Sequence, residues 1–247
     1  MTASAVQPGA GHRAWRGVVL LAVFALGIWA QSSGIVPAIL KYREDIVYLA
    51  RQHMTLVAIS GAIAIAIGIP LGILIARSRV PFLGPAIGQV INLGTTIPTL
   101  AILALAMTVL GLGTPSALFG LTVLTLLPIM LNTVAGLKSV PPPLIEAARG
   151  MGMTDQQILM KVELPNAMFV ILAGIRTALA INVGTVPLAF LIGGGGLGEL
   201  IFTGIDLMEP GLLLAGAIPT ALLAVFVDIF VGQLQFWLVP RGVNPLR

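Results

Sequence analysis

The sequence predicts an all-α membrane protein with about six transmembrane helices. Composition supports this fold class, because 57% of the 247 residues are hydrophobic and only 9% are charged, whereas soluble domains carry about 25% charged residues. The apolar residues also form runs of about 20, the length with which a helix crosses a bilayer. Cysteine is absent, which excludes disulfides, thiolate metal sites and a cysteine nucleophile.

Six apolar runs have the length of a membrane-spanning helix. The third contains Gly94 and Pro98, so we expect it to be broken or kinked near Thr95. A hairpin there would give seven spans, but the part before Gly94 is too short to cross alone. The first run is a retained helix or a cleaved signal peptide, and we favour the helix because its cleavage site would be poor. The runs cover residues 17–36, 54–76, 82–110, 116–137, 166–192 and 211–238.

The basic residues predict how the chain lies in the membrane. They are scattered at the ends of the apolar runs, which favours a role in topology over binding of nucleic acid. With the amino terminus inside, the outer side holds only Lys41, Arg43 and Arg51, and Arg176 lies within a run. The cytoplasmic side holds Arg13, Arg16, Arg77, Arg79, Lys138, Arg149, Lys161, Arg241 and Arg247.

This bias predicts a simple domain organisation. We expect both termini in the cytoplasm, with tails at residues 1–16 and 239–247. A single transmembrane domain at 17–238 would then contain one large cytoplasmic loop, at 138–165.

That loop includes a charged, soluble-looking segment, EAARGMGMTDQQILMKVELP at residues 146–165. A polar segment of good helix formers between two spans is typical of an element that docks onto a partner outside the membrane. The alternative is an amphipathic helix lying on lipid. That alternative accounts for the charges but not for the spacing of Gly152 and Leu164–Pro165.

Local signals predict two short helices in this loop. Three prolines at 141–143 end the preceding span, and about two helical turns follow. Gly152 allows the chain to turn, and Thr154 can then cap a second helix that runs through Lys161. Pro165 is expected to begin the next span, where its missing amide costs nothing.

The spacing of this segment resembles the cytoplasmic EAA loop of ATP-binding-cassette importer permeases. The stretches TTIPTL, AGIRTAL and GGGGLG, which begin at Thr95, Ala173 and Gly193, resemble the osmoprotectant branch, which imports glycine betaine, choline and carnitine. The resemblance implies a type I core of five spanning helices plus one amino-terminal helix, in a bacterial inner membrane. The positions it assigns to coupling with an ATPase are Glu146, Ala147, Ala148, Arg149, Gly152, Val162, Leu164 and Pro165; Val162 is the one departure, from Ile.

The resemblance also implies partners. These are a cytoplasmic cassette ATPase that binds ATP and Mg, a second copy or sister permease, and an extracytoplasmic substrate-binding protein, with lipid around the helices and no nucleic acid. The chain itself is expected to bind no cofactor or metal. Its glycine-rich stretch lacks the Lys-Ser or Lys-Thr of a phosphate loop, and Glu199 after it would repel phosphate.

Polar residues inside the spans are the next candidates, because charges in a membrane are costly. Arg176 and Asp228 lie 11 residues after Pro165 and 10 before Leu238, which puts both about 15 Å from the same face. We predict an ion pair, with contact to the substrate as the alternative. Asn92, Asn132 and Asn182 could line the pathway or form interhelical hydrogen bonds. The histidines, His12 and His53, lie in polar flanks and are read as solvated.

The outer face offers a candidate contact for the binding protein. It combines the loop from Gly193 to Gly198 with Glu199, Asp206 and Glu209, near which the sequence has no basic residue. These carboxylates could meet a basic patch on a partner, attract cations or simply be solvated. Aromatic residues are few and dispersed, so tight recognition of a quaternary ammonium is assigned to the separate protein.

These observations predict the permease subunit of an ATP-driven, binding-protein-dependent importer that works by alternating access. Osmoprotectants or quaternary amines are the expected cargo. The alternatives are the same machine for methionine, another amino acid or an organic anion, and a secondary transporter driven by an ion gradient. The chain is not expected to be an enzyme, because its carboxylates are dispersed and no nucleophile lies beside a base.

Overall fold

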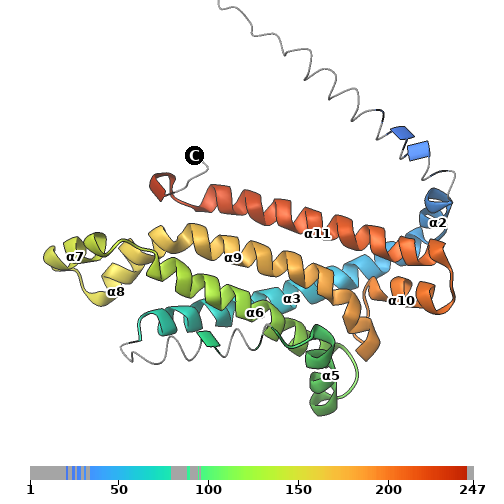
Figure 1. Cartoon of the computed structure of the whole chain (residues 1–247), viewed down its shortest axis with the longest axis horizontal. Helices are drawn as coiled ribbons and strands as arrows, with labels where there is room; N and C mark the ends of the chain where they lie inside the picture. The colour runs from blue at the N-terminus through green and yellow to red at the C-terminus, as the bar shows by residue number, and fades with distance from the viewer. Residues whose placement is uncertain are drawn as a thin grey trace, which may run out of the picture.

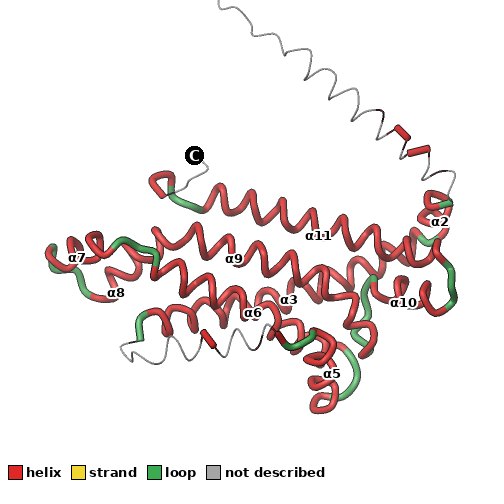
Figure 2. The backbone as a smooth tube through the Cα atoms, in the orientation of Figure 1, coloured by secondary structure: helices red, strands yellow, loops and turns green. Residues whose placement is uncertain are grey.

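The computed structural model describes residues 34–78 and 96–243, together with positions 21, 24, 25, 27, 28, 31, 88, 89 and 94. Within these parts all regular elements are helical, as Figure 2 shows. Part of the predicted first span lies outside the described residues, as does part of the third. His12, Asn92 and Thr95 also lie outside them.

Four long helices form a bundle along the long axis of the molecule (Figure 1). They are α3 (Arg43–Ala76), α6 (Thr114–Lys138), α9 (Leu164–Thr185) and α11 (Pro210–Leu238). Each is long and apolar enough to cross a membrane, α9 together with the segments that continue it at both ends. The four correspond to predicted spans.

Short helices occupy the two ends of the bundle. At one end lie α7 (Pro142–Gly150) and α8 (Asp155–Ile158). At the opposite end lie α2 (Ile35–Lys41) and α10 (Gly198–Asp206) (Figure 1). The remaining elements are α5 (Thr99–Leu110), a π-helical turn (Leu159–Glu163), and 3₁₀ helices at Val186–Ile192 and Arg241–Val243.

Two boundaries can be compared with the sequence analysis. Helix α5 begins directly after Pro98, which agrees with a break in the third run. Helix α3 begins at Arg43 instead of residue 54. Glu44 and Asp45 in its first turn favour the earlier start, because carboxylates stabilise the amino-terminal end of a helix dipole.

Small residues bring the long helices close together. Gly68 and Gly72 of α3 face α6, and a Cβ atom at Gly72 would lie only 2.6 Å from the Cβ of Thr133. On α9, Gly174 lies against the side chain of Asn132 in α6. Such contacts let helices pack in a membrane, where apolar side chains gain little by leaving lipid.

Candidate functional site

Helix α7 is an amphipathic element at one end of the bundle. It begins after Pro141 with Pro142 at its first position, where a missing amide costs nothing. Ala148 is buried and Ile145 packs against the main core. Glu146, Ala147 and Arg149 are exposed on the other face, so this face is free to contact a partner.

Gly152 ends α7 in a Schellman motif. The Met153 amide donates to the carbonyl of Ala148 at 3.1 Å, and the Gly152 amide donates to that of Arg149 at 2.9 Å. The motif needs a left-handed residue at Gly152, whose φ is +79°. Glycine takes this conformation without the steric cost that a Cβ atom brings. The spacing between EAA and Gly152 therefore has a local structural cause.

Thr154 starts α8 with a capping box. Its side-chain oxygen accepts from the Gln157 amide at 3.3 Å, and Gln157 Oε1 accepts from the Thr154 amide at 2.9 Å. Two amides that would otherwise be orphaned at the helix start are thus satisfied. The predicted cap at Thr154 is confirmed.

The predicted end of this second helix at Lys161 is wrong. Beyond α8 the chain continues through the π turn directly into α9, and the Leu164 amide donates to the carbonyl of Leu159, five residues back. Pro165 has no amide, and in a regular helix its ring would press on the carbonyl of Lys161. The wider π turn accommodates this proline, so Pro165 stands at the start of α9 as expected, but the helix runs into it without a break.

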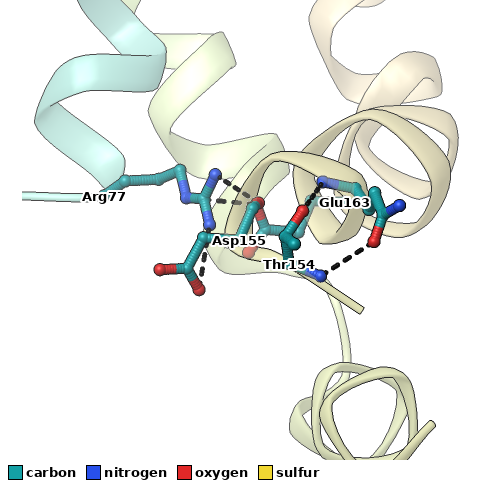
Figure 3. Close-up of polar contacts among 5 residues, drawn as sticks. Arg77, Thr154, Asp155 and Glu163 are labelled. Atoms are coloured by element: carbon teal, nitrogen blue, oxygen red, sulfur yellow. Dashed lines mark hydrogen bonds and ion pairs between the residues drawn. The ribbon is translucent and has the colours of Figure 1, made fainter. Parts of the chain in front are cut away.

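Arg77, at the carboxyl end of α3, holds this segment from the side (Figure 3). Its Nη1 donates to the backbone oxygen of Asp155 at 2.9 Å, and its Nε lies 3.5 Å from Oε2 of Glu163. The Glu163 side chain is only 12% exposed. Sequence reasoning assigned Arg77 to topology alone and did not single out Glu163, since no fixed spacing connects the two.

Arg176 and Asp228 form the ion pair predicted from their depth. Nε of Arg176 donates to Oδ1 at 2.7 Å and Nη2 to Oδ2 at 2.6 Å, a bidentate arrangement that joins α9 to α11. Both side chains are 39% exposed. Gly232 leaves room for the guanidinium, since a Cβ there would lie 3.1 Å from the Arg176 Cζ atom.

The described polar residues inside the bundle agree only in part with what was expected, and Asn182 is the one of them that forms an expected interhelical hydrogen bond. Asn182 is buried and donates from Nδ2 to Ser60 Oγ at 2.8 Å, an interhelical hydrogen bond from α9 to α3. Asn132 instead donates to the carbonyl of Pro128 in its own helix, at 2.8 Å. His53 is fully buried with Nε2 3.0 Å from the Val183 oxygen. Reading His53 as solvated is wrong, because α3 extends through it and packs it against α9.

The glycine-rich stretch at the opposite end is packed and is not a free turn. Gly193, Gly195 and Gly196 have φ values of +78°, +77° and +87°, which favour glycine. The Gly196 amide donates to Gln52 Oε1 of α3 at 3.2 Å. Gly198 lies so close to the Pro187 carbonyl that a Cβ atom would overlap it.

Glu209 has a cationic neighbour, contrary to the expectation for the outer face. Its Oε1 accepts from the Tyr42 hydroxyl at 2.8 Å, and Lys41 Nζ lies 3.4 Å away. The Tyr42 hydrogen bond, with help from the Lys41 charge, holds the pKa of Glu209 below its ordinary value. Tyr42 and Lys41 are far from Glu209 in the sequence, so no local pattern could indicate this contact. Glu199 and Asp206, on α10, are exposed.

Comparison with known proteins places this architecture in a family. Residues 68–241 match the family described as "Binding-protein-dependent transport system inner membrane component". The osmoprotectant import permease protein OsmY of Salmonella typhimurium is 48% identical over 227 residues, or 92% of this chain and 94% of that protein. The glycine betaine/carnitine/choline transport system permease protein OpuCD of Bacillus subtilis is 45% identical over 79% of this chain and 83% of its own length.

Solved structures agree on the fold. A chain of the MetNI methionine ABC transporter in an inward-facing conformation superposes with a TM-score of 0.70. The match covers 80% of this chain and 95% of that one, at 23% sequence identity. At this identity the likeness shows the fold alone, which is that of a type I importer permease.

Proposed function

The chain belongs to the family of binding-protein-dependent transport system inner membrane components, and on this premise we propose that it imports osmoprotectants of the quaternary-amine class. As a member of that family it is the membrane-spanning permease subunit of an ATP-binding-cassette importer. It is a transport subunit and not an enzyme.

One observation carries the choice of cargo, namely the 48% identity with an osmoprotectant import permease over nearly the whole length of both chains. Other relatives are named for carnitine, choline and glycine betaine. These cargoes share a quaternary ammonium group. The likeness to a methionine transporter is of fold only and does not favour methionine.

On the cytoplasmic side we infer that an ATPase subunit binds the exposed face of α7. The residues there are Glu146, Ala147 and Arg149, with apolar Leu144 and Met151 beside them, 44% and 69% exposed. Exposed apolar groups next to charges are typical of a docking surface. The ATPase would hold ATP and Mg, and closure of its subunits would move α7.

The orientation follows from the charges at this end of the bundle. Arg77 and Lys138 lie at the carboxyl ends of α3 and α6, and Arg149 and Lys161 lie in α7 and in the π turn that follows α8. These helix ends are at the end of the bundle that carries α7 and α8 (Figure 1). An excess of basic residues favours the cytoplasmic side. Both termini would then be cytoplasmic if the amino-terminal run spans once.

On the outer side we infer contact with a substrate-binding protein around α10. Because Glu209 is already bonded to Tyr42 and Lys41, we assign the contact with the binding protein to Glu199, Asp206 and the packed loop from Gly193 to Gly198. Rim charges mainly tune association rate and its salt dependence. Neutralising Glu199 and Asp206 should raise the concentration of binding protein needed for half-maximal ATPase stimulation, most visibly at low salt. An identical stimulation curve at every ionic strength would show that these carboxylates are merely solvated.

The transport mechanism in this proposal is alternating access. Binding-protein docking at one end and ATPase closure at the other would shift the helices of two permease subunits between outward-open and inward-open arrangements. The Arg176–Asp228 pair joins α9 to α11, so these two helices would move together. Asn132, partly buried on α6, is a candidate for the pathway lining.

Uptake measurements test the proposal directly. In a strain lacking this chain, restoring it with its ATPase and binding protein should restore uptake of labelled glycine betaine, carnitine or choline, with methionine as the control cargo. Uptake should stop when ATP is depleted and survive an ionophore. Uptake that survives ATP depletion but collapses with the ionophore would favour a gradient-driven transporter, and uptake of methionine alone would refute the choice of cargo.

A further inference from the structure

Arg77 and the π turn at Leu159–Glu163 occupy the junction between α3, α8 and α9. We propose that Arg77 is a positioning residue for coupling: with the π turn and Glu163 it fixes how α8 is rotated relative to α9, and it ties α3 to the same motion. This proposal rests on the proposed function, since it concerns how movement of the cytoplasmic helices reaches the spanning helices.

The first support is that one guanidinium contacts two points on the same helix. Asp155 is the first residue of α8 and Glu163 is the last residue of the π turn. Arg77 donates to the Asp155 oxygen at 2.9 Å and lies 3.5 Å from the Glu163 carboxylate (Figure 3). Arginine suits this role because its donors are arranged in a rigid fork.

The second support comes from helical geometry. In a regular helix, residues eight positions apart point in directions about 80° apart, whereas residues seven apart differ by only about 20°. A single π turn accommodates one additional residue, so Glu163 takes the direction that the seventh residue would have. The π turn is therefore what brings Glu163 onto the same face as Asp155, where Arg77 can reach both.

The third support is that local chemistry maintains the π turn. Pro165 cannot donate to the Lys161 carbonyl, and its ring would clash with that carbonyl in a regular helix. Asn166 donates from its side chain to the carbonyl of Val162 at 2.7 Å, a further hydrogen bond across the turn next to Pro165. Proline alone would permit other kinks, whereas proline with the Arg77 contact selects this one.

The consequence is that movement of α7 and α8 reaches two membrane-spanning helices, α3 and α9, at once. Helix α9 continues directly from the π turn, and Arg77 connects the same segment to α3. Within the membrane, α3 and α9 are joined again by Asn182 with Ser60 and by His53 with Val183. Without the Arg77 contact, α8 would rotate about the π turn while α3 stayed behind.

The test uses the complete importer in proteoliposomes and compares Arg77→Gln and Glu163→Gln with Lys138→Gln. Lys138 is an exposed cation at the same end of the bundle, so it controls for loss of charge. We call the contacts of Arg77 with Asp155 and Glu163 the clamp. Arg77→Gln and Glu163→Gln, the two clamp variants, should each lower the amount of cargo taken up per ATP hydrolysed by about fivefold, the lower end of the range for coupling between sites. Arg77→Lys should recover only part of the loss, and the double variant should be no worse than either single one.

A second measurement does not depend on cargo. The chain has no cysteine, so spin labels can be attached only at introduced sites, for which exposed Leu74 on α3 and Gln156 on α8 are suitable. In the assembled complex, Arg77→Gln and Glu163→Gln should broaden the distance distribution between these labels, and Lys138→Gln should leave it unchanged.

The two proposals fail in different ways. A wild-type complex that takes up no quaternary amine would refute the proposed function, while the label distances would still test the clamp. Unchanged distances and an unchanged uptake-to-ATP ratio in Arg77→Gln and Glu163→Gln would overturn the clamp, even if the yield of complex fell. Full recovery by Arg77→Lys would also overturn it, since charge alone would then suffice.

Discussion

At the end of the bundle that carries α7 and α8, most polar contacts join residues a few positions apart, as in the Schellman motif at Gly152 and the capping box at Thr154. At the opposite end they join residues far apart in the chain. Glu209 contacts Lys41 and the Gly196 amide reaches Gln52, at sequence separations of 168 and 144. The first end is thus a compact unit that Arg77 connects to α3 by polar contacts, suited to move as one body, while the second is pinned by several elements.

The largest expected effect concerns the link between α9 and α11, which lies between the two ends. Arg176→Ala or Asp228→Ala should lower the stability of the folded permease by about 2 kcal/mol, typical of hydrogen bonds to charged groups that are not fully buried. Thermal unfolding in detergent would measure this, and the charge swap should recover part of the loss. Equal damage from the swap and the single changes would show that the pair does not carry the effect.

Breaking the pinned end that carries α10 should have a comparable effect. Gly198→Ala would force a methyl group onto the Pro187 carbonyl, and overpacking of this kind costs about 1–3 kcal/mol. Gly184→Ala is the matched control, because nothing lies within 4 Å of a Cβ atom there. We expect a lower unfolding temperature for Gly198→Ala only. Equal behaviour of the two variants would mean that the loop adjusts freely.

Breaking the local end should affect coupling more than stability. Gly152→Asp puts a side chain on a residue with φ +79°, which costs about 1–2 kcal/mol of local strain. The permease should still reach the membrane but co-purify poorly with its ATPase. Gly150→Ala, a helical position with open space around it, should be harmless. Normal uptake and normal co-purification of the ATPase with Gly152→Asp would show that the Schellman motif at Gly152 has no role in coupling.

The smallest effect should be a pH dependence of the attachment of α2. Hydrogen bonding from Tyr42 lowers the pKa of Glu209 below its ordinary 4.5, so the folded state favours the charged carboxylate. Its contribution is present above pH 4.5 and is lost as the pH falls below that value. Amide protection factors in residues 35–42, which correct for the intrinsic pH dependence of exchange, should therefore fall in acid in the wild type. In Glu209→Gln the protection factors should be lower at neutral pH and respond less to acid.

The contrast between the ends also explains which expectations from sequence held. Gly152 and Thr154 act through contacts within five residues, so their roles can be read from spacing and residue type. The spans behave similarly, since hydropathy and length depend only on a continuous stretch of chain. The Arg176–Asp228 pair could also be predicted from the sequence, because a constant rise per residue converts sequence distance into depth in the membrane.

The expectations that failed depended on which surfaces meet. His53 looked solvated because its flanks are polar, but the face of α3 that carries it packs on α9. Glu209 looked unpaired because no basic residue is near it in sequence, but α2 lies beside the start of α11 and brings Lys41 to it. Lys161 looked like a helix end because proline normally marks a boundary, but a π turn absorbs Pro165 within one helix.

The sequence by itself determined that this is a helical membrane protein with a short polar segment, capped at Gly152 and Thr154, between two of its spans, because composition, hydropathy and local capping rules act along the chain. Only the tertiary structure decided that Arg77 joins Asp155 and Glu163 and that Asn182 bonds Ser60, as it decided the partners of Glu209. Those contacts depend on the rotation of each helix about its axis and on its neighbours. Both are set by packing between segments, which no local pattern records.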